Sequence, residues 1–240
     1  MTQLIFIDVG GHLGQSVEVA LAPSWRFDHV HTFEPDPACA RRIAERFADA
    51  IASGRLTVHQ AALSNGDGRL ALFGDNAKGG ASIVANALSE PGAPQTVEAL
   101  DVNRVLDGLG EDVHFYIKLN CEGGEIAILE RLCEAPWTDR IKGIVADFDV
   151  VKTGFGYYQK RRVIRRAAAK GLPMVLSEQV MVGKTHASRL SNWLSHYPEV
   201  AAPGVKLAPR PQLLKRRARY FLRDMRSAAG LNAKGYQRTR

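Results

Sequence analysis

The most regular feature of the chain is a series of short apolar runs separated by stretches of mixed polarity. Glycine, proline or charged residues bound each run, and the lengths suit strands that are buried on both faces of a parallel sheet. We expect strands at residues 3–9, 29–33, 55–63, 113–119 and 141–150, with a further strand after the turn signal at 64–68.

Between these runs the apolar residues recur at helical spacing. A helix beginning near Gly14 connects the first two runs, and Asp36 and Pro37 are a good N-cap and first-turn residue for a helix that extends to about residue 52. Two further helices are expected at 122–132 and 157–170, and the segments 172–182 and 188–197 complete the alternation.

This alternation predicts an α/β fold, with a mainly parallel sheet and helices on both faces in a Rossmann-like arrangement. We expect one domain over residues 1–205, followed by a tail over 206–240. The segment 74–94 is rich in glycine, alanine, serine and proline, which is typical either of a substrate-facing loop or of ordinary surface.

The net charge of +7 is concentrated in the tail. Residues 206–240 contain eleven lysines and arginines and the single acid Asp224, so the preceding residues have a charge of −3. Leu214, Phe221 and Met225 lie at helical spacing among these cations, which predicts a basic amphipathic helix. Four interpretations stay open: an anionic membrane surface, docking on the body or a partner protein, a nonspecific RNA contact, and a solvated tail.

Composition argues against several classes of protein. No run of about 20 apolar residues is present, and the first residues have neither a basic region nor a cleavage site. We therefore expect a cytoplasmic protein, associated at most peripherally with the inner membrane face. Cys39, Cys121 and Cys133 are too few and too irregularly spaced for disulfides or a zinc site. Because the basic excess lies in the tail, nucleic acid is not the expected substrate of the fold. Oligomerisation is left open.

A glycine-rich turn follows the first apolar run and carries the strongest local signal. It contains Asp8, Gly10, Gly11, Gly14 and Ser16. Such a turn brings backbone close to a ligand, and the helix after it presents free N–H groups. Nucleotide and dinucleotide sites have similar glycine spacing, and a tight turn without a ligand is the alternative.

Glu34 ends the second apolar run, about 20 residues after the glycine turn. A carboxylate at this position accepts hydrogen bonds from both ribose hydroxyls of a nucleoside. An acidic residue such as Asp8 beside the turn favours a cationic sulfonium over a dinucleotide. The combination indicates a methyl donor of the S-adenosylmethionine type.

The chain resembles the FkbM-type methyltransferases, which depend on S-adenosylmethionine. Five blocks occur in the family's order over roughly residues 4–132: FIDVGGHLGQS, HTFEPDPA, VHQAALSNGDGRLALF, VEALDVNRVL and YIKLNCEGGEIAILERL. The resemblance implies methylation of a hydroxyl on a saccharide or another small molecule of glycan or natural-product biosynthesis. It says little about residues 150–240, where the acceptor is usually chosen.

The resemblance also implies roles for residues of the cofactor site. Glu34, with Pro35 beside it, would hold the ribose, and Ala62 with Ser64 would lie near the adenine. Asp8, Gly10 and Gly14 would shape the methionine end, and we count Gly11 and Ser16 of the same turn among the cofactor-binding residues.

Two positions depart from the family pattern. Asn120 stands where the family usually has aspartate, which removes a charge and puts in doubt any role of that side chain as a base or magnesium ligand. Gly11 and His12 replace the more frequent Ala-Asn.

Methyl transfer from a sulfonium is an in-line displacement, in which a base removes the hydroxyl proton as attack proceeds. Candidates for the base are Glu122, His12 and Asp147, with Glu122 first because it follows a strand whose carboxyl end faces the crevice. The alternative for Glu122 is a structural role, in which the positive end of a helix dipole stabilises its carboxylate. Lys118 would neutralise a developing oxyanion or pair with a neighbouring carboxylate.

Two other functions remain open at this point. The basic tail suggests an RNA or protein methyltransferase, although an Asn-Pro-Pro-Tyr-like tetrapeptide for planar nitrogen acceptors is missing after the fourth buried strand. Asn120 and the altered turn also suit a regulatory protein that binds S-adenosylmethionine without turnover.

Overall fold

The central feature of the molecule is a sheet of six parallel strands. The computed structural model describes residues 2–74, 82, 94–148 and 156–209. Within these residues the strands have the order β3-β2-β1-β7-β8-β9. Numbered among themselves, they follow the order 3-2-1-4-5-6 of Rossmann folds, which confirms the predicted α/β class.

The strands of this sheet match the apolar runs of the sequence. Their bounds are β1 (Gln3–Val9), β2 (His29–Phe33), β3 (Leu56–His59), β7 (Val113–Leu119), β8 (Ile141–Ala146) and β9 (Met174–Leu176). Parallel strands need long crossover connections, and helices supply them here. The order in which the strands are added to the sheet reverses between β1 and β7, so a crevice is expected at the carboxyl ends of these two strands.

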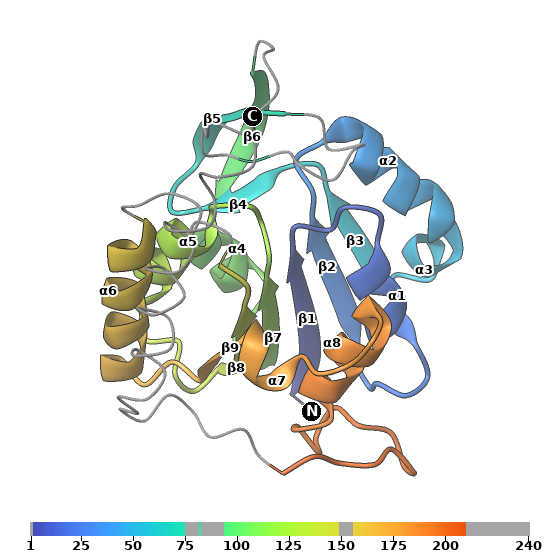
Figure 1. Ribbon diagram of the computed structural model, residues 1–240. Helices are drawn as coiled ribbons and strands as arrows, with labels where there is room; N and C mark the ends of the chain where they lie inside the picture. Colours follow the sequence, from blue (N-terminus) through green and yellow to red (C-terminus); the bar gives the residue numbers. More distant parts are fainter. Residues whose placement is uncertain (1, 75–81, 83–93, 149–155, 210–240) are drawn as a thin grey trace, which may run out of the picture.

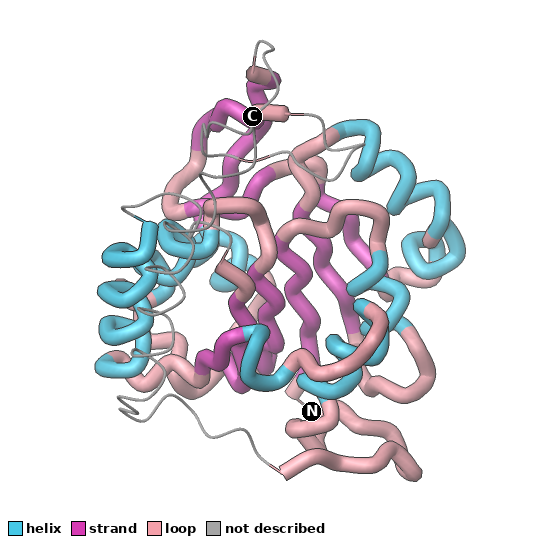
Figure 2. Tube along the Cα trace, viewed as in Figure 1, coloured by secondary structure: helices cyan, strands magenta, loops and turns pink. Residues whose placement is uncertain are grey.

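Helices cover both faces of the sheet, as Figures 1 and 2 show. One face packs against α4 (Val102–Gly108), α5 (Glu125–Leu132) and α6 (Gly156–Ala169). The other packs against α1 (Gln15–Leu21), α2 (Pro37–Arg46), α3 (Ala48–Ala52), α7 (Ser177–Val180) and α8 (His186–Leu194).

A second, smaller sheet contains β4 (Ala62–Ser64), β6 (Gln95–Asp101) and β5 (Gly68–Leu72) in that order. It lies above the carboxyl ends of the central strands in Figure 1. The prediction of one strand over 55–63 is wrong, because the chain leaves β3 after His59 and enters the second sheet at Ala62. Strand β6 and helix α4 were not expected from the apolar pattern.

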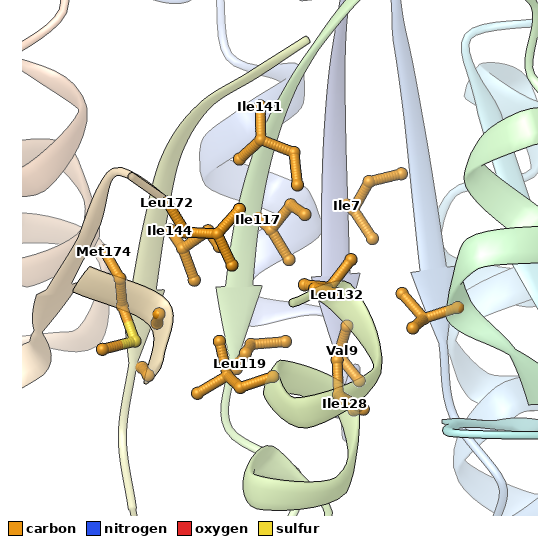
Figure 3. Close-up of a cluster of buried hydrophobic side chains, with 14 of the residues drawn as sticks. Ile7, Val9, Ile117, Leu119, Ile128, Leu132, Ile141, Ile144, Leu172 and Met174 are labelled. Carbon is orange, nitrogen blue, oxygen red and sulfur yellow. The ribbon is translucent and has the colours of Figure 1, made fainter. Parts of the chain in front are cut away.

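The two faces of β1 bury different side chains. Ile7 and Val9 point toward α5 and pack with Ile117, Leu119 and other aliphatic residues of the core, as Figure 3 shows. Phe6 points the other way, toward α1 and α8. Asp8 lies on the same face as Phe6, because side chains alternate along a strand.

Several helix boundaries differ from the sequence predictions. The helix expected to extend to residue 52 is divided at Phe47, whose backbone leaves helical geometry at φ −116° and ψ 30°. The helix expected from residue 122 begins at Glu125, because Glu122 and Gly123 have positive φ angles of 52° and 113°. The predicted N-cap Asp36 is confirmed, since its side chain accepts a hydrogen bond from the Cys39 N–H.

Some predictions concern residues outside those described. Most of the segment 74–94 and residues 210–240 of the basic tail belong to this group. Among the described helices, none has the length and apolar character needed to cross a membrane. The three cysteines are free thiols, as expected.

Candidate functional site

A cavity of about 250 Å³ opens at the carboxyl ends of β1, β2 and β7. Open α/β sheets bind ligands at this place, where the order of the strands reverses. The described residues that line it are Val9, Gly10, Gly11, His12, Gln15, Ser16, Phe33, Glu34, Pro35, Ala62, Leu63, Leu72, Lys118, Asn120, Cys121, Glu122, Gly124 and His186.

The glycine turn after β1 is shaped by close internal packing. A Cβ atom on Gly10 would lie 1.8 Å from the backbone oxygen of Asn120, and Gly10 also has a φ of 85°. A Cβ on Gly11 would lie 2.4 Å from Thr32 Oγ1. Gly14 has a φ of 80°, and a Cβ there would meet the ring of Phe47 at 2.6 Å. The protein's own packing therefore already requires these glycines, before any ligand is considered.

Glu34 fixes the conformation of this turn from the end of β2. Its Oε2 accepts a hydrogen bond of 2.6 Å from the His12 N–H, and its Oε1 accepts one of 2.9 Å from the Asp36 N–H. Burial raises the pKa of Glu34 to about 7, although the two backbone N–H groups act in the opposite direction. Glu34 is 2% exposed and lines the cavity.

A layer of polar side chains lies beneath the cavity on the α1 and α8 face of the sheet. Thr32, Asp8 and Lys118 occupy directly adjacent positions on β2, β1 and β7. The Lys118 ammonium lies 2.9 Å from Asp8 Oδ1 and donates to the Gly10 carbonyl oxygen at 2.8 Å, while Thr32 Oγ1 donates to Asp8 Oδ2 at 3.2 Å. Asp8 is fully buried, so the Lys118 ion pair neutralises its charge below the cavity.

The loop after β7 also lines the cavity. Glu125, fully buried at the start of α5, accepts hydrogen bonds from the Cys121 N–H at 2.8 Å and the Gly123 N–H at 3.1 Å. Glu122 has a φ of 52° within this loop. The buried Oδ1 of Asn120 has no hydrogen-bond partner among the described residues, so a ligand N–H or O–H group can satisfy it.

Helix α8 contributes His186 to the cavity. Its Nε2 lies 2.9 Å from Ser16 Oγ in α1. Burial lowers the pKa of His186 below its usual value of 6.5; the positive charges of Lys118 and Arg189 lower it further, and Asp8 opposes them. The imidazole is therefore neutral at neutral pH.

The structure brings most of the site residues selected from the sequence into one cavity. Those that line it are Gly10, Gly11, His12, Ser16, Glu34, Pro35, Ala62, Lys118, Asn120 and Glu122. Four of the selected residues are not among the lining residues. Asp8 lies beneath the cavity, Gly14 is the N-cap of α1, and Ser64 is buried in β4 with its hydroxyl directed at Asn65. The expected proximity of Asp8 to a sulfonium needs correction, because Lys118 already pairs with its carboxylate. Asp147, the third candidate for the base, also does not line the cavity.

Sequence reasoning missed several lining residues. Leu63 and Leu72 come from the second sheet, whose position above the crevice no periodicity revealed. His186 follows Thr185, a recognisable N-cap, but only the packing of α8 against α1 places its side chain at the cavity.

Comparison with known proteins identifies the family of the chain. No curated protein matches the chain. A crystal structure of the methyltransferase FkbM from Methylobacillus flagellatus KT matches with 17% sequence identity and a TM-score of 0.35, over 55% of this chain and 29% of that protein. The matched part is thus about a third of the length of that relative. The methyltransferase FkbM domain matches residues 8–162, which include every described lining residue except His186. The chain therefore belongs to the FkbM methyltransferase domain family.

Proposed function

We propose that this protein transfers a methyl group from S-adenosylmethionine to a hydroxyl oxygen of a saccharide or a glycan-related small molecule. The observation that carries the proposal is the placement of Glu34. The carboxylate lines the cavity at the end of β2, beside the glycine turn of β1, in a chain of the FkbM methyltransferase domain family.

The residues present suit the nucleoside part of the donor. An ionised carboxyl group has about four acceptor sites, and the backbone N–H groups of His12 and Asp36 occupy two of them. Ribose hydroxyls can donate to the same carboxylate oxygens, because Glu34 lines the cavity. Beyond Glu34, the cavity wall contains Ala62 and Leu63, whose apolar surface suits an adenine ring.

The charges around the cavity favour a cationic ligand over a dinucleotide. Glu34 and Glu122 line the cavity, and the ammonium of Lys118 is already paired with Asp8. Among the described lining residues, this leaves no unpaired lysine or arginine to neutralise a pyrophosphate. The buried Oδ1 of Asn120 can accept a hydrogen bond from the amino group of S-adenosylmethionine or from the hydroxyl group that is to be methylated.

When bound, S-adenosylmethionine supplies an electrophilic methyl group. The residues of the chain contribute position and a proton acceptor, since orientation supplies much of the rate in an in-line displacement. Glu34 and Glu125 each hold a loop that lines the cavity, through hydrogen bonds to backbone N–H groups. Glu122 and His12, two of the candidates for the base selected from the sequence, also line the cavity.

The experiment is a titration of the protein with S-adenosylhomocysteine, followed by assays of radioactive methyl transfer to glycans, RNA and protein. We expect binding and methylation of a glycan that is lost with Glu34→Ala. Methylation of RNA or protein instead would replace the proposed acceptor class. Binding without transfer to any acceptor of the panel would support a regulatory role, and no binding would refute the proposal.

A further inference from the structure

His186 is the only described lining residue that lies outside the segment matched by the family. It is the first residue of α8, whose N-cap Thr185 accepts a hydrogen bond from the Ser188 N–H. Helix α8 packs against α1, the helix that follows the glycine turn. The imidazole therefore reaches the cavity from a rigid element of the second half of the chain.

The hydrogen bond to Ser16 fixes one ring nitrogen of this imidazole. Ser16 Oγ lies 2.9 Å from His186 Nε2, and Ser16 is itself buried in α1. If Nε2–H donates to the serine oxygen, Nδ1 keeps its lone pair and can accept a proton. This hydrogen bond fixes the orientation of the ring and leaves Nδ1 to accept a proton.

The charged groups that face His186 keep it neutral. Lys118 on β7 and Arg189 on α8 itself disfavour the protonated ring, whereas Asp8 on β1 favours it. Ser16, its contact on α1, has no charge. Because Asp8 and Lys118 pair with each other, burial is the largest influence on the pKa of His186. A neutral imidazole keeps a lone pair on one ring nitrogen, which can accept a proton as a general base.

We propose that His186 is a catalytic residue that accepts the proton of the acceptor hydroxyl during methyl transfer, an inference that rests on the proposed function. The acceptor oxygen forms a bond to the methyl carbon, the methyl carbon–sulfur bond breaks, and its electron pair remains on sulfur. The hydroxyl proton moves to Nδ1 of His186. Ser16 is then a positioning residue, because it sets the orientation and tautomer of the ring.

This role separates two parts of the cavity. The segment matched by the family supplies the glycine turn and Glu34, which suit the donor. His186 enters from beyond residue 162, outside the matched segment. The assignment takes the role of base from Glu122, which ranks first among the candidates from the sequence.

The first test is nuclear magnetic resonance of the histidine side chains in the protein saturated with S-adenosylhomocysteine or with S-adenosylmethionine, with His186→Gln for assignment. We expect the Nε2–H tautomer. We also expect a pKa of His186 about one pH unit lower in the S-adenosylmethionine complex, because a nearby sulfonium charge disfavours the imidazolium. The opposite tautomer, or equal pKa values in the two complexes, would overturn the inference while leaving the proposed function intact. Failure of both ligands to bind would refute the proposed function itself.

The second test compares His186→Gln with Glu122→Gln, using an acceptor found in the glycan panel. The glutamine amide retains a hydrogen bond to Ser16, so we expect unchanged thermal stability and S-adenosylhomocysteine affinity, with kcat reduced about 100-fold or more. A larger loss of kcat in Glu122→Gln than in His186→Gln would return the role of base to Glu122. His196→Gln, a histidine just after the same helix that does not line the cavity, is the control. Reduced stability and affinity without a selective loss of kcat would assign His186 a structural role and refute the proposal.

Discussion

The substitution Glu34→Gln tests the proposed ribose contact most sharply, because it changes charge and hydrogen bonding with little change in volume. The two carboxylate oxygens of Glu34 already accept the N–H groups of His12 and Asp36. Glu34 lines the cavity, where ribose hydroxyls can donate to the same two oxygens. The glutamine amide keeps one acceptor oxygen and turns an NH₂ group toward a backbone N–H, so one ribose hydrogen bond is lost.

A hydrogen bond to a charged group contributes about 1.5–3 kcal/mol. We therefore expect the variant to bind S-adenosylhomocysteine about 10- to 150-fold more weakly than the wild-type protein. Isothermal titration calorimetry at pH 8 measures this difference. The change Asp36→Asn is a matched control, because asparagine is an equally good N-cap for α2 and Asp36 does not line the cavity. Equal affinity of wild type and Glu34→Gln would refute the assignment of the ribose to Glu34.

The pH dependence of binding gives an independent measure of the same contact. Burial raises the pKa of Glu34 to about 7, and ribose hydroxyls donate to the ionised carboxylate. The ligand therefore favours the deprotonated form, so binding releases a proton, and affinity falls as the pH is lowered below 7, by up to about tenfold per pH unit. Calorimetry in two buffers with different ionisation enthalpies measures the released proton. Wild-type affinity that stays constant from pH 5.5 to 8 would contradict this reasoning.

Three further predictions concern stability, measured by urea or thermal unfolding. Lys118→Met leaves the Asp8 charge buried without its partner and should lower the free energy of unfolding by about 3–5 kcal/mol. Adding Asp8→Leu to the same chain should restore much of this loss. An unchanged stability of Lys118→Met would contradict the ion pair. Gly10→Ala should cost more than about 2 kcal/mol, because its Cβ would lie 1.8 Å from a backbone oxygen, whereas Gly66→Ala, with nothing within 4 Å, should change stability by less than about 0.5 kcal/mol. Burial lowers the pKa of His31 to about 3, with help from two neighbouring histidines, so this residue disfavours the folded state progressively as the pH falls from 6.5 toward 3. His31→Leu should reduce the acid sensitivity of the protein, and an unchanged pH profile would show that this histidine does not govern it.

The central sheet could be predicted from the sequence because each of its strands is buried on both faces. Continuous apolar runs such as 3–9 and 113–119 have no competing interpretation once glycines and charged residues bound them. The second sheet could not be predicted in the same way. Its strands are short, and β5 and β6 alternate between exposed and buried positions, so 55–63 read as one strand although it belongs to two sheets.

The candidate site was predictable where its residues directly follow a recognisable strand, and less so where segments far apart in the sequence meet. Gly10 and Glu34 follow strands whose parallel pairing brings their carboxyl ends together. Pairing of Lys118 with a neighbouring carboxylate was one of two expectations, but only the register between β1 and β7, two segments far apart in the chain, identifies Asp8 as its partner. His186 was missed for the same reason, since only the packing of α8 on α1 places it at the cavity.

The most direct test of a donor site at the carboxyl ends of β1 and β2 is a crystal structure of the complex with S-adenosylhomocysteine. Our account predicts the ribose hydroxyls within hydrogen-bonding distance of Glu34, the adenine against Ala62 and Leu63, and the sulfur beside the glycine turn. The ligand bound at another place, or a dinucleotide from the expression host in this cavity, would contradict it.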